Sequence, residues 1–79
     1  MPVLAIATTL DCRGLACPLP IVKTAQAMKA LGPGELIEVY ATDKGALKDF
    51  AAWATSTGNP LVEQTKDGEV LRFVLQKKG

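Results

Sequence analysis

The chain contains no histidine among its 79 residues and only two cysteines, Cys12 and Cys17. Without histidine there is no Ser-His-Asp or Cys-His nucleophile pair, no histidine general base and no histidine metal ligand. Two cysteines cannot complete a four-ligand zinc site by themselves, and they are too few for a secreted scaffold with several disulfides. Any chemistry must therefore use thiols, carboxylates, lysines or backbone groups, and we expect neither a metal nor a cofactor.

An excess of charge of one sign is also lacking, because nine Lys and Arg face eight Asp and Glu for a net charge of +1. Nucleic-acid binding would require a basic stripe, which this balance does not supply. The apolar start of the chain has no basic residue, runs into Asp11 and is too short for a membrane span, so it predicts neither a signal peptide nor a membrane helix. We expect a cytoplasmic protein whose thiols stay reduced.

The length and the hydrophobic content of 48% predict a single globular domain over residues 1–79. Four segments have the apolar patterns of strands, and two have the apolar spacing of helices. The expected strands are Val3–Leu10, Glu35–Thr42, Leu61–Thr65 and Val70–Gln76, the first of them buried on both faces. The expected helices are Pro18–Leu31, stopped by a left-handed Gly32 before Pro33, and a second that Asp43 caps and Gly58 and Pro60 end.

The order of these elements, β-α-β-α-β-β, determines the fold class. Asp67-Gly68 lies between the last two strands and is a strong signal for a hairpin. Parallel strands that are joined through helices require right-handed crossovers, which place both helices on the same face of the sheet. The sequence therefore predicts an α/β two-layer sandwich, with two helices on one face of a four-stranded mixed sheet.

Cys17 lies where the first helix is expected to begin, followed by Pro18 and Pro20 in the sequence Cys-Pro-Leu-Pro. Proline suits the first helical turn, so Pro18 as first helical residue makes Cys17 the N-cap, where the helix dipole lowers the pKa of a thiol. Pro20 removes one of the usual N–H donors, so we expect a moderately activated thiolate, helped by Arg13 or Lys23 if either lies close. The structural alternative is a small buried side chain that merely precedes a helix.

The segment Asp-Cys-Arg-Gly-Leu-Ala-Cys-Pro-Leu-Pro, from Asp11 to Pro20, resembles the signature of the TusA/SirA/YedF family of small sulfur-carrier proteins. The family hallmark is Cys-Pro-x-Pro opening the first helix, and length, element order and motif position agree over essentially the whole chain. The resemblance implies that Cys17 takes sulfane sulfur as a persulfide and hands it to a protein acceptor, as a sulfurtransferase-type carrier without independent turnover. It also implies a donor protein, either a cysteine desulfurase or a rhodanese.

The pathway is less defined than the chemistry. Members of this family serve tRNA thiolation, sulfur oxidation, molybdenum-cofactor supply or selenium metabolism. Members resembling the tRNA 2-thiouridine branch tend to carry an acidic residue between the two prolines, whereas this chain has Leu19. That departure weakens the case for the tRNA route but not the case for sulfur carriage. Leu15 and Leu19, apolar residues near Cys17, are candidate contacts for the partner proteins.

Four further residues each have a structural and a functional interpretation. Cys12 could resolve a Cys17 persulfide or form a disulfide with Cys17, although we favour packing at the end of the first strand. Asp11 and Arg13 could form a surface ion pair, or Arg13 could order the loop or face the persulfide anion, as the resemblance suggests. Asp49 is expected to be solvated, or to pair with Arg13 or a lysine.

Three functions therefore remain open from the sequence. A sulfur carrier would use Cys17 as its only essential thiol. A thiol-redox switch would need a reversible disulfide between Cys12 and Cys17. A regulatory interaction module would need neither thiol. The resemblance favours the first of these functions.

Overall fold

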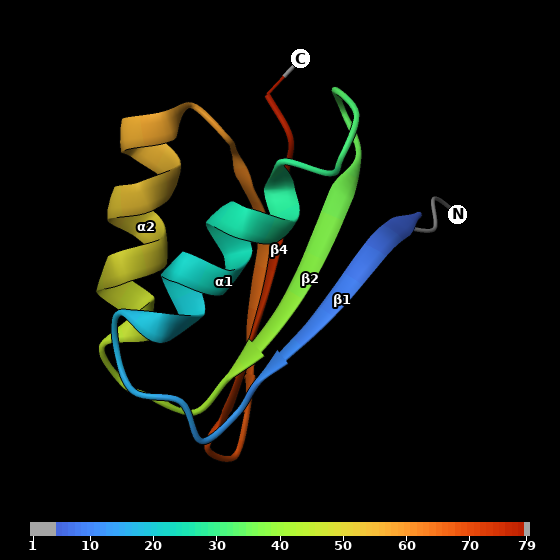
Figure 1. The fold of residues 1–79 in the computed structure, drawn as a ribbon. Coiled ribbons are helices and arrows are strands. Elements are labelled where there is room, and N and C mark those ends of the chain that lie inside the picture. Colours follow the sequence, from blue (N-terminus) through green and yellow to red (C-terminus); the bar gives the residue numbers. More distant parts are fainter. Residues whose placement is uncertain (1–4, 79) are drawn as a thin grey trace.

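The computed structural model describes residues 5–78, which form two layers, one of strands and one of helices (Figure 1). The elements in chain order are β1 (Ile6–Cys12), α1 (Leu19–Met28), β2 (Leu36–Ala41), α2 (Ala46–Thr57), β3 (Leu61–Asp67) and β4 (Val70–Gln76). This is the order that the sequence predicts. Within the described residues, no helix has both the length and the apolar character needed to cross a membrane.

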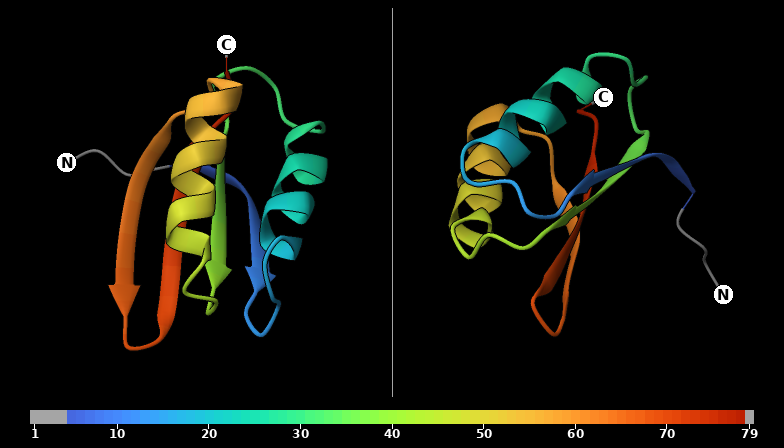
Figure 2. Two further views of the ribbon diagram at one scale, coloured as in Figure 1. Left: turned by 90° about the vertical axis from the view of Figure 1, so that its left-hand side faces the viewer. Right: turned by 60° about the horizontal axis from the view of Figure 1, so that its bottom comes forward.

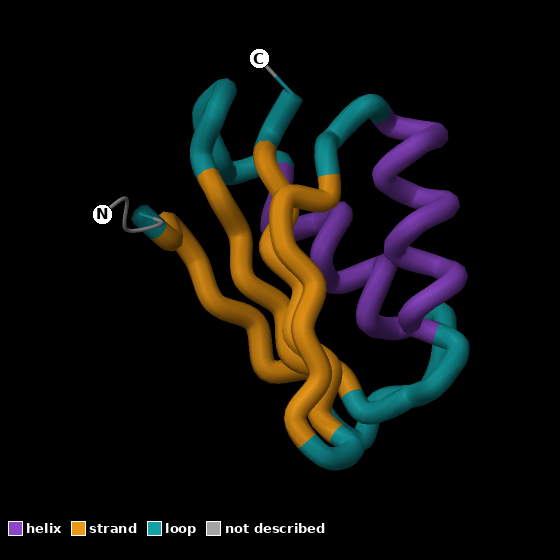
Figure 3. The backbone as a smooth tube through the Cα atoms, turned by 180° about the vertical axis from the view of Figure 1, so that it is seen from behind, coloured by secondary structure: helices purple, strands orange, loops and turns teal. Residues whose placement is uncertain are grey.

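The four strands form one mixed sheet in the order β1-β2-β4-β3. β1 pairs with β2 in parallel, whereas β4 runs antiparallel to both β2 and β3. Figure 2 shows both helices on the same face of this sheet, and Figure 3 shows the opposite face uncovered. The predicted fold class, with two helices on one face of a four-stranded mixed sheet, is confirmed.

The hydrophobic core lies between the helices and the two central strands. Every second residue of β2 and β4 points into it, which is the alternation expected of strands with one covered face. These core residues are Ile37, Val39, Ala41, Leu71, Phe73 and Leu75. From the helical layer, the fully buried ring of Phe50 stacks on Phe73 with centroids 4.4 Å apart. Trp53 packs at the margin of the same core.

The first strand differs from the prediction in its bounds and in its burial. β1 runs from Ile6 to Cys12, and the part of the predicted strand before residue 5 lies outside the described residues. Its side chains alternate between exposed positions and positions that are partly buried or, at Cys12, fully buried, instead of being buried on both faces. The physical reason is that both helices lie on the same face of the sheet, so only the side chains that point toward the helices are covered, and most of those on the edge strand β1 are covered in part.

The ends of the helices also differ from the prediction. α1 begins at Leu19 with Pro18 as its N-cap, and after Met28 the chain continues with tighter bonds such as Leu31 N–H to the Met28 carbonyl, 3.1 Å. α2 begins at Ala46 after Gly45, and the Asp43 side chain does not cap it. The Asp43 carboxylate instead accepts a hydrogen bond from the backbone N–H of Cys17, in the loop between β1 and α1.

Glycine positions mark the chain reversals. Gly58 ends α2 in the left-handed conformation, with φ of 78°, and this helix end is where the sequence places it. After α1 the left-handed residue is Gly34 and not the predicted Gly32. The hairpin predicted from Asp67-Gly68 is present, and β3 connects to β4 through Gly68 and Glu69.

We expect the Phe50→Ala substitution to lower the free energy of unfolding by about 3–5 kcal/mol, because it deletes a fully buried ring and leaves a cavity against Phe73. Urea denaturation followed by circular dichroism measures the loss. If Phe50→Ala does not fold, Phe50→Leu gives a smaller loss in the same direction. The control is Val22→Ala, at a side chain 43% exposed on α1, with a change within about 0.5 kcal/mol. Equal losses at both positions would contradict this description of the core.

Candidate functional site

Two loops meet at one end of the sheet, below the helices in Figure 1. Because β1 and β2 are parallel, the loop of residues 13–18 and the loop of residues 42–45 both leave the sheet at this end. The Gly14 N–H donates to Thr42 Oγ1 at 2.9 Å, and the Cys17 N–H donates to Asp43 Oδ2 at 2.9 Å. These two hydrogen bonds fix the position of Cys17 against the second loop.

The Cys17 thiol is exposed and lies beside the first turn of α2. Its S–H donates to the Oδ2 carboxylate oxygen of Asp49. A carboxylate that accepts this proton favours the neutral thiol over the thiolate, so Asp49 raises the pKa of Cys17 to about 11. The negative charge of Asp43 acts in the same direction. At neutral pH the free protein therefore holds Cys17 as a protonated thiol.

This result overturns the expectation of an activated Cys17 thiolate at a helix N-terminus. Cys17 precedes the N-cap residue Pro18, so it is one position farther from the helix than the sequence predicts. Pro18 and Pro20 have no N–H, and the N–H of Leu19 donates to the carbonyl of Ala16 at 2.9 Å. The residues from Pro18 to Pro20, where α1 begins, thus have no free N–H to offer the sulfur. The carboxylate of Asp49 on α2 determines the ionisation of the Cys17 thiol.

The two cations that could have assisted Cys17 act elsewhere. Arg13 forms a two-pronged ion pair with Asp11, with Nε to Oδ1 at 2.8 Å and Nη2 to Oδ2 at 2.9 Å. The Arg13 N–H also donates to the same carboxylate, and together these contacts lower the pKa of Asp11 to about 2. Burial raises the pKa of Cys12, and the positive charge of Lys23 partly offsets that rise but does not act on Cys17. Arg13 therefore braces the turn that follows β1.

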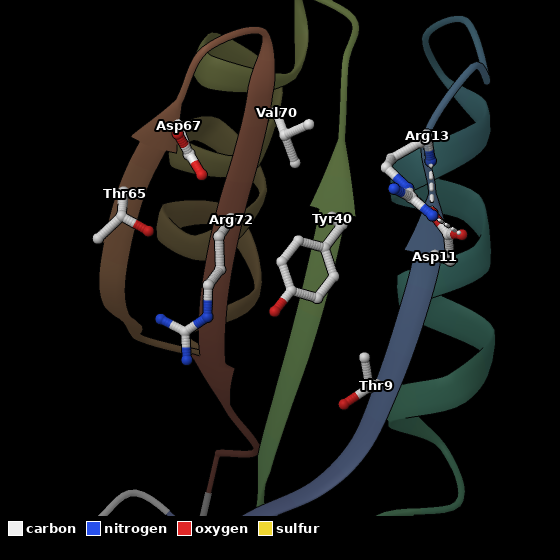
Figure 4. Close-up of a pocket in the computed structure, with 8 residues that line it drawn as sticks. All are labelled: Thr9, Asp11, Arg13, Tyr40, Thr65, Asp67, Val70 and Arg72. Atoms are coloured by element: carbon white, nitrogen blue, oxygen red, sulfur yellow. Dashed lines mark hydrogen bonds and ion pairs between the residues drawn. The ribbon is translucent and has the colours of Figure 1, made fainter.

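The Asp11–Arg13 pair lies on the uncovered face of the sheet, beside a hollow of about 630 Å³ (Figure 4). The hollow is lined by Thr9, Asp11, Arg13, Tyr40, Thr65, Asp67, Val70 and Arg72. Arg72 also bridges Glu38 and Glu63 across neighbouring strands. Cys17 is not part of this lining, so the thiol and the hollow are separate features of the molecule.

The remaining predicted residues have distinct positions. Cys12 ends β1 with no exposed surface, and burial raises the pKa of its thiol. Pro20 is fully buried, and its carbonyl accepts a hydrogen bond from Thr24 Oγ1 at 2.8 Å. Leu19 is 46% exposed, whereas Leu15 packs partly buried against the core. Of the two apolar residues proposed as partner contacts, Leu19 is thus the accessible one.

Sequence reasoning did not identify Asp43 or the role of Asp49 as neighbours of Cys17. Their contacts with Cys17 span 26 and 32 residues, so no local motif contains them. The available signal was topological: two parallel strands followed by helices on one face bring both loops to the same end of a sheet. Within residues 5–78 there is no group of three or more Cys, Asp and Glu side chains arranged to hold a metal ion.

Comparison with known proteins identifies the family. The family model described as sulfurtransferase TusA matches residues 8–77. YrkI of Bacillus subtilis, named as a candidate sulfur carrier protein, is 54% identical over 86% of this chain and 91% of its own length. The sulfur carrier protein TusA of Allochromatium vinosum is 43% identical over 86% of this chain and 90% of its own length.

The crystal structure of a SirA-like protein from Desulfitobacterium hafniense has the same fold, with a TM-score of 0.79 and 23% identity. The match covers 91% of this chain and 99% of that one. Named sulfur carriers among the relatives support a sulfur-carrier role, which implies proteins that supply and receive the sulfur. The matched residues, the named relatives and the shared fold agree with the signature around Cys17, and the chain belongs to the TusA family.

Proposed function

We propose that Cys17 is the sulfur-carrying residue, that it accepts a sulfane sulfur from the persulfide of a donor protein, and that it passes this sulfur to an acceptor protein. The observation that carries the proposal is the contrast between the two thiols. Cys17 is exposed where two loops meet, whereas Cys12 has no exposed surface in the core. Only an exposed sulfur can meet the cysteine of another protein without local unfolding.

The transfer is a thiol exchange at the terminal sulfur of a persulfide. The Cys17 sulfur, as thiolate, attacks the outer sulfur of the donor group Cys–S–SH. A new S–S bond forms on Cys17, the S–S bond of the donor breaks, and the donor cysteine leaves as a thiolate that takes up a proton. The balance is one thiol plus one persulfide on each side, so no oxidant or reductant is consumed. Unloading is the same exchange with an acceptor thiol.

The surroundings of Cys17 suit a carrier that meets several partners in turn. Pro18 and the two hydrogen bonds between the loops hold the sulfur in one position, which reduces the conformational entropy lost on docking. Leu19 on α1 and Leu47 on α2 are exposed apolar side chains at the helix ends nearest the thiol. We assign these two leucines to partner contact, because exposed apolar groups around a reactive atom favour association.

The proposed function includes a compartment, a class of donor and a class of acceptor. We place residues 1–79, as one sulfur-carrier domain, in the cytoplasm, where thiols and persulfides are not consumed by disulfide formation. The donor would be a cysteine desulfurase or a rhodanese. The acceptor would belong to tRNA thiolation, sulfur oxidation or cofactor biosynthesis, and the apolar Leu19 between the prolines favours the routes other than tRNA thiolation.

Intact-protein and peptide mass spectrometry after incubation with cysteine and a cysteine desulfurase tests this function. We expect a gain of one sulfur atom on the Cys17 peptide, removed by reductant and absent in Cys17→Ser. Cys12→Ala should load as the unmodified chain does, since it shortens a buried side chain without burying a hydroxyl. A rhodanese with thiosulfate is the second donor. Loading of Cys12, or no loading from either donor, would refute the assignment.

Docking through Leu19 is tested by its truncation. Leu19→Ala should raise the carrier concentration for half-maximal loading by a cysteine desulfurase about tenfold, since a buried leucine contributes on the order of 1.5–3 kcal/mol. Val62→Ala is the matched control, because both side chains are 46% exposed and Val62 lies on β3. The measurement is the initial rate of loading against carrier concentration. Equal effects of the two variants would remove Leu19 from the docking surface.

A further inference from the structure

Two carboxylates lie next to Cys17, and within the described residues neither forms an ion pair. Asp49 accepts the S–H of Cys17, and Asp43 accepts its backbone N–H. Among residues 5–78 the ion pairs are those of Arg13 with Asp11 and of Arg72 with Glu38 and Glu63, and neither Asp43 nor Asp49 takes part in one. Both charges that act on the Cys17 thiol are negative, one from α2 and one from the loop before it.

This arrangement opposes sulfur transfer in both directions. During loading the Cys17 thiolate is the attacking group, and during unloading it is the leaving group. A neighbouring carboxylate destabilises that thiolate, and it also repels the anion of a bound persulfide. The free carrier is therefore held in an unreactive form, and some group brought by the partner must remove the effect of Asp49 before sulfur moves.

We propose that Asp49 is a specificity-determining residue, which selects donor and acceptor proteins that place a lysine or arginine side chain against it on docking. This inference rests on the proposed sulfur-carrier function and adds the chemistry of the partner. A cation at Asp49 replaces the S–H as the partner of the carboxylate, and the Cys17 thiolate becomes accessible. The proton lost by Cys17 is balanced by the one that the departing thiolate of the donor takes up.

The two carboxylates have different roles in this scheme. Asp43 holds the Cys17 backbone at 2.9 Å and therefore keeps the loop in place. Asp49 projects from the first turn of α2, and its contact with the Cys17 loop is made through the sulfur. Asp49 can exchange the S–H for a cation while the two loops stay joined, whereas Asp43 cannot be withdrawn without releasing the Cys17 backbone. Asp49 is thus the carboxylate available to a partner.

Small disulfides of different charge test the selectivity without a partner protein. The probes are cystamine, which is cationic, bis(2-hydroxyethyl) disulfide, which is neutral, and dithiodiglycolate, which is anionic. Rates of exchange are measured in a Cys12→Ala background, and each is divided by the rate of the same probe with N-acetylcysteine amide. We expect Cys17 to favour cystamine over dithiodiglycolate by about tenfold or more at low salt, and less at high salt.

Asp49→Asn should reduce that preference to about threefold or less. Asp67→Asn is the matched control, because it removes the same charge from the uncovered sheet face and should leave the preference unchanged. The inference is overturned if Asp49→Asn keeps the full preference, or if Asp67→Asn reduces it equally. Asp49→Ala repeats the test with a side chain that cannot accept the S–H.

The pH profile of alkylation by iodoacetamide gives a second measurement. Loss of Asp49 should move the pKa of Cys17 from about 11 toward its usual 9.0. Burial and Asp43 still raise the pKa in the variant, so thiolate increases by at most about a hundredfold near neutral pH. Because a less basic thiolate is less nucleophilic, we expect alkylation to become faster by up to about tenfold. An unchanged profile in Asp49→Asn and Asp49→Ala overturns the inference. Absent persulfide loading with normal charge selectivity would instead refute the proposed function alone.

Discussion

The hydrogen bonds between the β1–α1 loop and the β2–α2 loop are the contacts on which the site depends. They can form because β1 and β2 are parallel and both crossovers return over the same face of the sheet, which brings two helix beginnings together. Without that topology, Cys17 would be an exposed cysteine before a helix, with no partner for its backbone or its sulfur. The thiol acquires its chemistry from residues that the fold supplies, not from its own segment.

The fold was predictable because its signals are local. The alternation of Ile37, Val39 and Ala41, the Asp-Gly turn and the glycine after α2 each lie within a few residues of the element they define. The partial burial of β1 was not predictable, because an edge strand and a central strand can have the same local sequence pattern and differ only in which strands lie beside them. The identity of Cys17 as candidate thiol followed from its motif, whereas its ionisation depends on Asp49, 32 residues away.

Two effects compete at the Cys17 sulfur, and their relative size depends on distance. The positive end of a helix favours a thiolate, but its influence is confined to the first turn and relies on free N–H groups. Here the N-cap Pro18 and the second helical residue Pro20 have no N–H, and the Leu19 N–H between them donates to the Ala16 carbonyl. A carboxylate in direct contact with the sulfur has no such restriction. The prolines at the start of α1 therefore make the loop rigid, and the ionisation of the Cys17 thiol is determined by the carboxylates beside it.

If Cys17 carries sulfur as proposed, the burial of Cys12 has a consequence for the loaded persulfide. A second accessible thiol five residues away could attack the inner sulfur of a Cys17 persulfide, closing a disulfide and releasing hydrogen sulfide. Because Cys12 has no exposed surface and its pKa is raised, it is poorly placed to make that attack. The proposed carrier would therefore give up its sulfur on meeting another molecule and would not lose it to its own second thiol.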